Sequence, residues 1–479
     1  MTAARLDDAL RAASAAAPPG RSALEDEDER ISFSEMDAEA GRVADRLTAA
    51  GHRRDEAVLV PVSNRARDMV AFFAVWRAGG VVVPVHRTTP EPAVDRLRRR
   101  IGAPSVVNLR ADIDVAATLR TEGSVRRLQT DGPPPPEILK DAAWVIFTSG
   151  TTGEPKGVVH GHQTYLAKLR MIDGVLHYSD DERVLEVLQL SFIFAQWVAM
   201  LTLLKGGTVV FHEKFDAECF LEALQGGITR VAMVPTMMRA LRQLRPQDGA
   251  NGAASFAGAI MSGGEVLDAP LRRWLRDRWP DARIWDIYGL TETATTDFIV
   301  GPEDGEAAAG TIGQPGLGID YRIAEPDGEL QIRSPYAMRG YFGAPRLTAE
   351  AFDGAYFRTG DLARRLDSGD VRLIGRRKDM INRGGNKVAP LEVERAFLEH
   401  PEITAALATG IEDPLKGEAV HLMAVLAGGA KATPDSLRHW GRQRLERYKV
   451  PDAVHIATAL PQGRTGKADR QALRDVLSR

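Results

Sequence analysis

One segment of the chain combines residue types that can hold the phosphate groups of a nucleotide. It runs from Phe147 to Gly157 and contains three glycines, four hydroxyl side chains and Lys156. Glycines let the backbone approach a ligand closely, and backbone N–H groups, hydroxyls and an ammonium can hold phosphate oxygens. Because Lys156 is followed by glycine and not by serine or threonine, this is not a Walker A loop. The candidate phosphate-binding residues are Thr148, Ser149, Gly150, Thr151, Thr152, Gly153 and Lys156.

A second candidate cluster lies at the ends of two later strand-like runs. Ser262-Gly263-Gly264 ends one of them, and residues 288–292 follow the other. Ligands bind at the carboxyl ends of strands in α/β sheets. Tyr288 could stack on a base, Thr291 could donate to a phosphate, and Glu292 could bind Mg²⁺, which prefers oxygen ligands. The backbone of residues 262–264 could contact adenine.

Three further segments place charged residues beside glycines. Residues 356–361 end in Asp361, whose carboxylate could accept both hydroxyls of a ribose. Residues 375–388 are strongly basic and contain a glycine pair, and residues 463–467 end in a lysine near the C-terminus. Taken one at a time, each of these segments could be an ordinary surface turn.

The elements that must position these residues alternate between strand-like and helix-like runs. Short apolar runs at 57–62, 81–85, 142–147 and 230–234 are separated by helical patterns, which predicts buried parallel strands with crossover helices and an α/β fold. We expect Ser34 to cap an early helix and a later helix to span 434–447. The pattern changes near Gly375, which predicts domains at 1–375 and 376–479.

Composition excludes several classes of protein. The 479 residues include 62 Lys plus Arg and 65 Asp plus Glu, a net charge of −3 that indicates no nucleic-acid partner. Cys219 is the only cysteine, so an internal disulfide is excluded and a reducing cytoplasm is expected. No apolar run approaches the ~18 residues of a membrane span. His160 and His162 have no third ligand near them in the sequence, so they do not indicate a metal site.

Taken together and in this order, the segments resemble the adenylate-forming (ANL) superfamily, which includes acyl- and aryl-CoA synthetases, amino-acid adenylation domains and luciferases. The resemblance implies a large N-terminal domain of layered α/β sheets and a small, mobile α+β C-terminal domain, with the active site between them. It also implies ATP and Mg²⁺ as cofactors. The ATP-binding residues that it implies are Thr148, Ser149, Gly150, Thr151, Thr152, Gly153, Lys156, Ser262, Gly263, Gly264, Asp286, Tyr288, Gly289, Asp361 and Arg376.

The resemblance further implies a two-step reaction. An acid reacts with ATP to give an acyl-adenylate and pyrophosphate, with Lys467, Thr291 and Glu292 as catalytic residues and Glu292 as the Mg²⁺ ligand. The acyl group then passes to the thiol of CoA or, as the alternative, to the phosphopantetheine arm of a carrier protein. Lys378 corresponds to the hinge about which the small domain turns. Gly384 and Gly385 correspond to the tunnel for the thiol.

The substrate acid is less well defined by the sequence. By the same resemblance, Phe192, Phe194, Trp197 and Val234 line the acid pocket. There is no acidic residue between Ser191 and Gly207, which argues against an amino acid as substrate. The Phe, Trp and Met side chains of the pocket segments favour an apolar acid, aromatic or medium-length aliphatic. The enzyme could be a monomer or a homodimer. A non-catalytic nucleotide-binding protein of the same fold is the alternative from another class.

Overall fold

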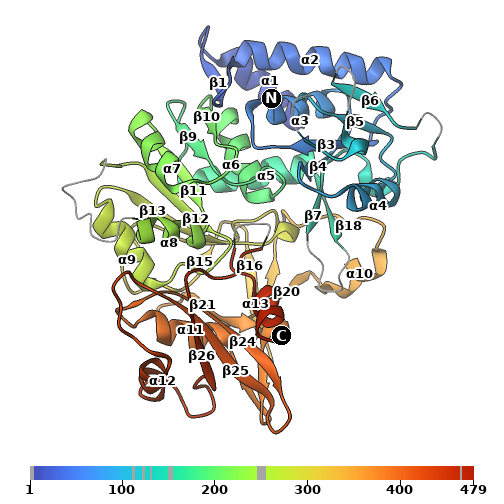
Figure 1. Cartoon of the computed structure of the whole chain (residues 1–479). Helices are drawn as coiled ribbons and strands as arrows, with labels where there is room; N and C mark the ends of the chain where they lie inside the picture. The colour runs from blue at the N-terminus through green and yellow to red at the C-terminus, as the bar shows by residue number, and fades with distance from the viewer. Residues whose placement is uncertain are drawn as a thin grey trace.

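The computed structural model describes residues 5–110, 114–120, 124–129, 132–148, 155–244, 255–463 and 467–478. The chain forms a large lobe, and the orange-to-red C-terminal part forms a smaller lobe below it (Figure 1). Both lobes combine helices with sheets, so the predicted α/β class is confirmed.

The first sheet of the large lobe contains β3 (Ala57–Val62), β4 (Val81–His86), β5 (Ser105–Val107), β6 (Val125–Arg127), β7 (Ala142–Thr148), β8 (Lys156–Gly161) and β18 (Gly340–Tyr341). The strand order is β18-β8-β7-β4-β3-β5-β6. Central strands β3 and β4 are parallel, rich in valine and almost wholly buried, as expected for strands covered on both faces.

The second sheet contains β1 (Ser22–Glu25), β2 (Arg30–Ser32), β9 (Arg183–Glu186), β10 (Thr208–Phe211), β11 (Arg230–Met233), β12 (Ala259–Gly263), β13 (Arg283–Tyr288), β14 (Phe298–Val300) and β15 (Gln314–Pro315). Its order is β15-β14-β13-β12-β11-β9-β10-β1-β2. Strands β10, β9, β11, β12 and β13 run parallel, so their carboxyl ends lie along one edge.

Helices pack against both sheets. They are α1 (Leu6–Ala16), α2 (Phe33–Ala49), α3 (Ala66–Arg77), α4 (Glu91–Ile101), α5 (His162–Leu176), α6 (Ile193–Leu204), α7 (Ala217–Ala223), α8 (Pro235–Leu244), α9 (Ala269–Arg278) and α10 (Pro345–Glu350). One hydrophobic core joins α2, α3, α5 and α6 to Val60 of β3, Trp144 of β7 and Met261 of β12. Because this core is closely packed, the two sheets are held in fixed positions relative to each other.

Two smaller sheets complete the fold. The third contains β16 (Asp320–Ala324), β17 (Glu329–Arg333), β19 (Phe352–Asp353), β20 (Tyr356–Arg365) and β21 (Val371–Arg376). The fourth contains β22 (Ile381–Arg383), β23 (Asn386–Val388), β24 (Ile403–Asp413), β25 (Gly417–Leu426) and β26 (Ala453–Ala457), with helices α11 (Pro390–Leu398), α12 (Pro434–Arg442) and α13 (Arg470–Leu477). The third sheet thus ends at Arg376, and the fourth has its own core. The boundary between residues 375 and 376 itself stays a prediction.

Two local predictions are wrong. The cap of α2 is Ser32 and not Ser34, because the Ser32 hydroxyl accepts from the backbone of Glu35 while the Glu35 carboxylate accepts from the backbone of Ser32. Helix α12 ends at Arg442 and not at residue 447. Beyond it, Arg383 of β22 donates to the carbonyls of Arg447 and Tyr448.

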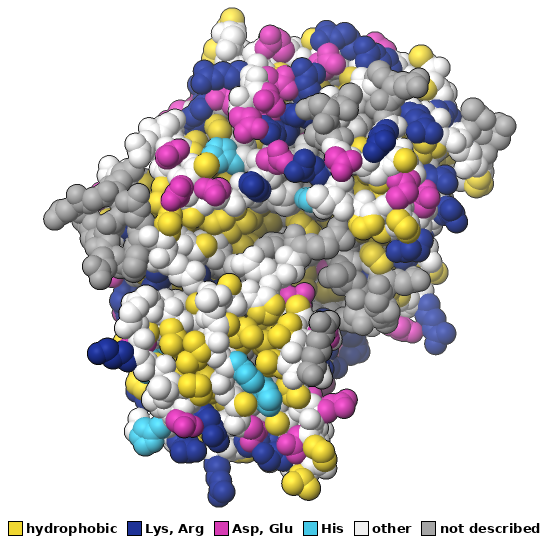
Figure 2. All heavy atoms as spheres, in the orientation of Figure 1, with side chains coloured by type: hydrophobic (Ala, Val, Ile, Leu, Met, Phe, Trp, Pro, Cys, Tyr) yellow, Lys and Arg dark blue, Asp and Glu magenta, His cyan; other side chains and the backbone are white. Residues whose placement is uncertain are grey.

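The surface carries charges of both signs. Figure 2 shows Lys and Arg interspersed with Asp and Glu over the visible face, in line with the small net charge. Among the helices in the ranges given above, none combines the length and the hydrophobicity that a bilayer span requires.

Candidate active site

The two glycine-containing strand ends predicted from the sequence are neighbours. Strands β12 and β13 pair in parallel, with Ser262 opposite Asp286 and Gly263 opposite Ile287. The segments that follow them, Gly264 and Tyr288 to Glu292, therefore leave the sheet side by side at its carboxyl edge. This edge is where ligands bind in parallel α/β sheets.

The chain folds back sharply after Tyr288. The Asp297 N–H donates to the Tyr288 carbonyl at 2.7 Å, which closes the turn that includes the short helix η4 (Thr291–Thr293). A Cβ atom added at Gly289 would lie 2.3 Å from the Thr296 nitrogen, so only glycine fits there. The turn thereby presents Thr291 and Glu292 at the sheet edge.

Three predicted nucleotide-binding residues meet below this turn. The Tyr288 hydroxyl donates to Asp361 Oδ2 at 2.7 Å, and Arg376 Nε donates to Asp361 Oδ1 at 2.9 Å. Burial and, after it, the Asp361 charge raise the pKa of Tyr288, so its hydroxyl remains a donor. Asp361 is only 3% exposed, so these two donors offset the cost of burying its charge.

The predicted phosphate-binding segment is held at its two described ends. Strands β7 and β8 are antiparallel, and Thr148 lies opposite Lys156. A Cβ atom at Gly157 would lie 2.9 Å from Phe147 Cζ, so the base of the loop is tightly packed. The other predicted residues of this loop, Ser149, Gly150, Thr151, Thr152 and Gly153, lie outside the described residues.

Glu292 is held by its backbone and by its side chain. The Met338 N–H donates to the Glu292 carbonyl at 2.7 Å, and the Tyr341 hydroxyl donates to Glu292 Oε1 at 2.8 Å. Throughout the described ranges, Oε2 accepts no hydrogen bond and no group of three metal-ligating side chains occurs. One carboxylate with a free oxygen suits Mg²⁺, which takes one or two carboxylates together with phosphate oxygens and water.

Lys467 reaches the same edge from the small lobe. Gly264 has φ +81°, and a Cβ atom there would lie 2.5 Å from Lys467 Nζ, so the ammonium packs directly on the Gly264 backbone. Burial lowers the pKa of Lys467; the charge of Glu265 opposes this shift and the charge of Arg376 adds to it. The structure thus brings Lys467 to the end of β12.

Asp286 lies beneath the site. It is 6% exposed, and burial raises the pKa of its carboxyl to about 8, against opposing effects of the Ser262 side chain and the Arg272 charge. The carboxyl is therefore mostly protonated at neutral pH. These surroundings indicate that Asp286 stabilises strand β13 as a buried group.

Aromatic side chains approach the edge from α6. A Cβ atom at Gly263 would lie 2.9 Å from Phe194 Cε1, and the Phe194 ring stacks on Trp197 at 5.6 Å between centroids. Trp197 is wholly buried behind Phe194, and Phe192 is half-buried at the start of the helix. Val234 is also buried, and its side chain would lie 3.8 Å from a Cβ atom at Gly264. Phe194 and Val234 thus both lie beside the glycines that end β12.

The predicted hinge and thiol-tunnel residues lie elsewhere. Lys378 is exposed in the short helix η5 (Arg377–Asp379), between the third and fourth sheets. Gly384 and Gly385 form the exposed turn between β22 and β23, with φ +56° and +82° and open space around an added Cβ atom. In this arrangement, Lys467 contacts Gly264 from the small lobe.

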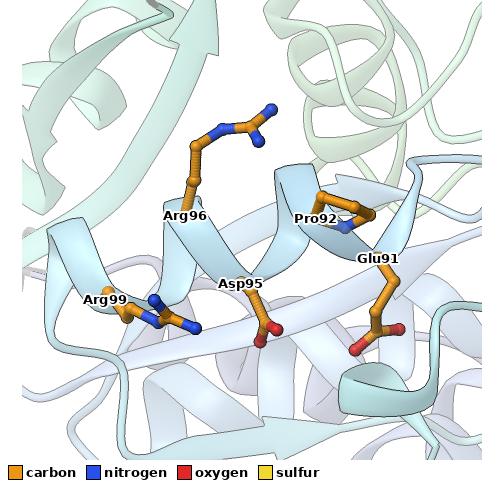
Figure 3. Close-up of a pocket in the computed structure, with 5 residues that line it drawn as sticks. All are labelled: Glu91, Pro92, Asp95, Arg96 and Arg99. Atoms are coloured by element: carbon orange, nitrogen blue, oxygen red, sulfur yellow. The ribbon is translucent and has the colours of Figure 1, made fainter.

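A surface hollow along α4 does not belong to this site. It is lined by Glu91, Pro92, Asp95, Arg96 and Arg99 (Figure 3). Arg96 points away from the two carboxylates, which accept hydrogen bonds from the Thr118 hydroxyl. These contacts are typical of a solvated helix face.

Comparison with protein families identifies the fold. Residues 11–342 match the family model of AMP-binding enzymes, and residues 392–467 match that of the AMP-binding enzyme C-terminal domain. The chain belongs to the AMP-binding enzyme family. The family assignment predicted from the sequence motifs is therefore confirmed.

The alignments with individual relatives cover nearly the whole of this AMP-binding enzyme. Feruloyl-CoA synthase from an Amycolatopsis species is 31% identical over 459 residues, covering 91% of this chain and 92% of that protein. The o-succinylbenzoate CoA synthetase of Bacillus subtilis, solved with its acyl-adenylate intermediate, aligns with a TM-score of 0.79 at 25% identity, covering 98% of each chain. ATP-bound MatB from Rhodopseudomonas palustris aligns with a TM-score of 0.84 at 22% identity, covering 98% of this chain and 99% of that one.

These matches confirm the predicted reaction class. The chain is an AMP-forming acid–thiol ligase, which uses ATP and Mg²⁺ to activate a carboxylic acid and passes the acyl group to CoA. The ANL fold with a large and a small domain is likewise confirmed.

Two supporting residues of the site were not predicted. Tyr341 contacts both Glu292 and Lys156, and His160 Nε2 bonds to the Thr291 carbonyl at 2.7 Å. Burial lowers the pKa of His160 to about 4, so the ring is neutral and donates. Neither residue has a charge or spacing that marks it in a single sequence.

Proposed function

We propose that this AMP-binding enzyme activates an aromatic carboxylic acid. The observation that supports this most is the Phe194 ring, which lies against Gly263 and stacks on Trp197 directly beside the end of β12. Aromatic rings favour offset or edge contacts with other rings, so such a wall suits an aryl group. The similarity to a feruloyl-CoA synthase favours the same class, because a feruloyl group is aromatic.

We also propose the residue roles in the first step. The acid's carboxylate oxygen attacks the α-phosphorus of ATP, and pyrophosphate leaves. Thr291 contacts the α-phosphate and Glu292 binds Mg²⁺, which offsets phosphate charge when bound. The ammonium of Lys467, held on the Gly264 backbone, stabilises the charge that develops on the phosphorus oxygens.

Further residues bind the rest of ATP in this proposal. The 148–156 loop holds the β- and γ-phosphates, with Lys156 as its point charge. Asp361 accepts the ribose hydroxyls through the lone pairs that Tyr288 and Arg376 leave free. The backbone of residues 262–264 borders the adenine. Asp286, opposite Ser262 in the neighbouring strand, belongs to the same proposed ATP-binding set.

The second step requires a different arrangement of the small lobe. We propose domains at 1–375 and 376–479 that turn about Lys378, withdrawing Lys467 and bringing the Gly384–Gly385 turn to the site. The thiol sulfur then attacks the carbonyl carbon, and AMP leaves with the bridging oxygen. Glycines suit a narrow passage because they carry no side chain.

The proposal also covers the acyl acceptor, the oligomeric state and the location of the enzyme. A carrier-protein arm has the same thiol as CoA, so it is the second acceptor to test. The chain could act as a monomer or a homodimer. The cytoplasm is the expected location, because a chain with one cysteine suits a reducing compartment.

A pyrophosphate-release screen tests the proposal. Benzoates, cinnamates and straight-chain acids are supplied with ATP, with and without CoA, and we expect the aromatic acids to give the highest kcat/KM. A clear preference for straight-chain acids would refute the aromatic assignment. In parallel, Lys467→Ala should lose adenylation but still form thioester from supplied acyl-adenylate, and normal adenylation by that variant would refute the role of Lys467.

A further inference from the structure

Tyr341 lies between two groups that come from distant parts of the chain. Its hydroxyl donates to Glu292 Oε1 at 2.8 Å, and Lys156 Nζ lies 5.1 Å from the centre of its ring. Lys156 starts β8 at the end of the phosphate-binding loop, while Glu292 belongs to the turn after β13. The Tyr341 side chain thus contacts one site residue from the first sheet, Lys156, and one that follows a strand of the second sheet, Glu292.

The position of Tyr341 is fixed by the first sheet. Tyr341 pairs with Val158 of β8, and the Phe342 N–H donates to the Gly157 carbonyl at 2.7 Å. The Tyr341 N–H also donates to the Thr348 hydroxyl at 2.9 Å. The side chain is 3% exposed, so it has little freedom to leave Glu292.

The hydroxyl of Tyr341 acts as a donor only. Its partner is a carboxylate oxygen, which can only accept, so the hydroxyl must supply the proton of this hydrogen bond. Its hydrogen bond occupies one carboxylate oxygen of Glu292, whose carbonyl is held in turn by the Met338 N–H. The other oxygen, Oε2, accepts no hydrogen bond from the part of the chain that is described.

We infer that Tyr341 is a positioning residue that orients Glu292 for its cation and links it to the phosphate-binding lysine Lys156. The inference rests on the proposed role of Glu292 as the Mg²⁺ ligand. A carboxylate that is already oriented loses less conformational freedom on binding a cation. The ring of Tyr341 also gives the Lys156 ammonium a cation–π contact when phosphate is absent.

The test measures cation binding without turnover. Mn²⁺, which like Mg²⁺ prefers oxygen ligands, is titrated by electron paramagnetic resonance in the presence of ATP and without acid. Tyr341→Phe removes only the hydroxyl and keeps the ring, and we expect it to raise the Mn²⁺ dissociation constant by about tenfold, the scale of one hydrogen bond to a charged group. The KM for the acid should change far less, since no acid contact is removed.

The matched control is Tyr356→Phe. Tyr356 also donates to a carboxylate, but to Asp320 Oδ2 at 2.7 Å and not to Glu292. This variant should leave Mn²⁺ binding within about twofold of the wild type. A similar loss in both variants would overturn the inference, because the effect would not be specific to Glu292.

Glu292→Gln separates the inference from the proposed function. If Glu292→Gln weakens Mn²⁺ binding and adding Tyr341→Phe weakens it no further, the hydroxyl acts through Glu292 and the inference is supported. If Glu292→Gln weakens binding while Tyr341→Phe does not, the positioning role is wrong and the metal role stands. If Glu292→Gln leaves binding unchanged, the proposed metal role of Glu292 is itself wrong.

Discussion

Substituting Gly264 by alanine should separate the two half-reactions. The new Cβ atom would lie 2.5 Å from Lys467 Nζ and 2.7 Å from Cε, both at the flexible end of a side chain. The lysine end can move aside cheaply, so we expect the fold to survive with only the cost of a left-handed alanine at φ +81°, about 1–2 kcal/mol. The displaced ammonium should raise the adenylation barrier by about 3–4 kcal/mol, or ~10²–10³-fold in rate.

The assay follows both half-reactions of Gly264→Ala. Adenylation is measured by acid-dependent exchange of pyrophosphate into ATP, and thioester formation is measured from synthetic acyl-adenylate and CoA. Gly354→Ala is the matched control, because Gly354 has φ +61° but no atom within 4 Å of an added Cβ atom. Exchange by Gly264→Ala at the control's rate would refute the placement of Lys467 on Gly264.

Two further predictions concern buried charge. Lys168→Met should cost about 3–5 kcal/mol in urea-induced unfolding, because it leaves Asp297 without the ammonium now 2.9 Å away, and both side chains are at most 1% exposed. Lys205→Met, which breaks the more exposed pair with Asp173, is the control and should cost under about 1 kcal/mol. Asp286 has a pKa of about 8 in the folded chain against 3.8 as its ordinary value, so the native state holds a proton that the unfolded state loses as pH rises through 4. Its contribution to stability is therefore present at low pH and declines from pH 4 to 8. Asp286→Asn should reduce the decline of the free energy of unfolding with pH by up to about 1.4 kcal/mol per pH unit. Equal slopes of this free energy against pH in the wild type and the variant would contradict the prediction.

The sequence predicted the parts of the site that lie at strand ends. Gly263, Gly264 and Tyr288 lie at the ends of apolar runs in the sequence. Where such runs are correctly identified as parallel strands, their carboxyl ends must lie along one edge of the sheet. Asp361 was a candidate from its own segment and was assigned to the ribose by the resemblance; its contacts with Tyr288 and Arg376 fit the predicted nucleotide site.

The supporting contacts could not be predicted in the same way. Tyr341 reaches Glu292 through β18, a two-residue strand that pairs with β8 across a long stretch of sequence. Nothing in its neighbours distinguishes it from a core tyrosine. The contacts of His160 and His162 likewise emerge only from packing: His160 bonds to the Thr291 carbonyl, and His162 Nδ1 accepts from the Leu6 N–H at 3.2 Å.

The central claim is that the acid's own oxygen attacks the α-phosphorus of ATP at the edge formed by Gly264 and Thr291. It is tested most directly with an aromatic acid labelled with ¹⁸O in its carboxylate, supplied with ATP and CoA, followed by mass spectrometry of the products. The account predicts one labelled oxygen in AMP and none in pyrophosphate. Label in inorganic phosphate together with ADP, or unlabelled AMP, would contradict it.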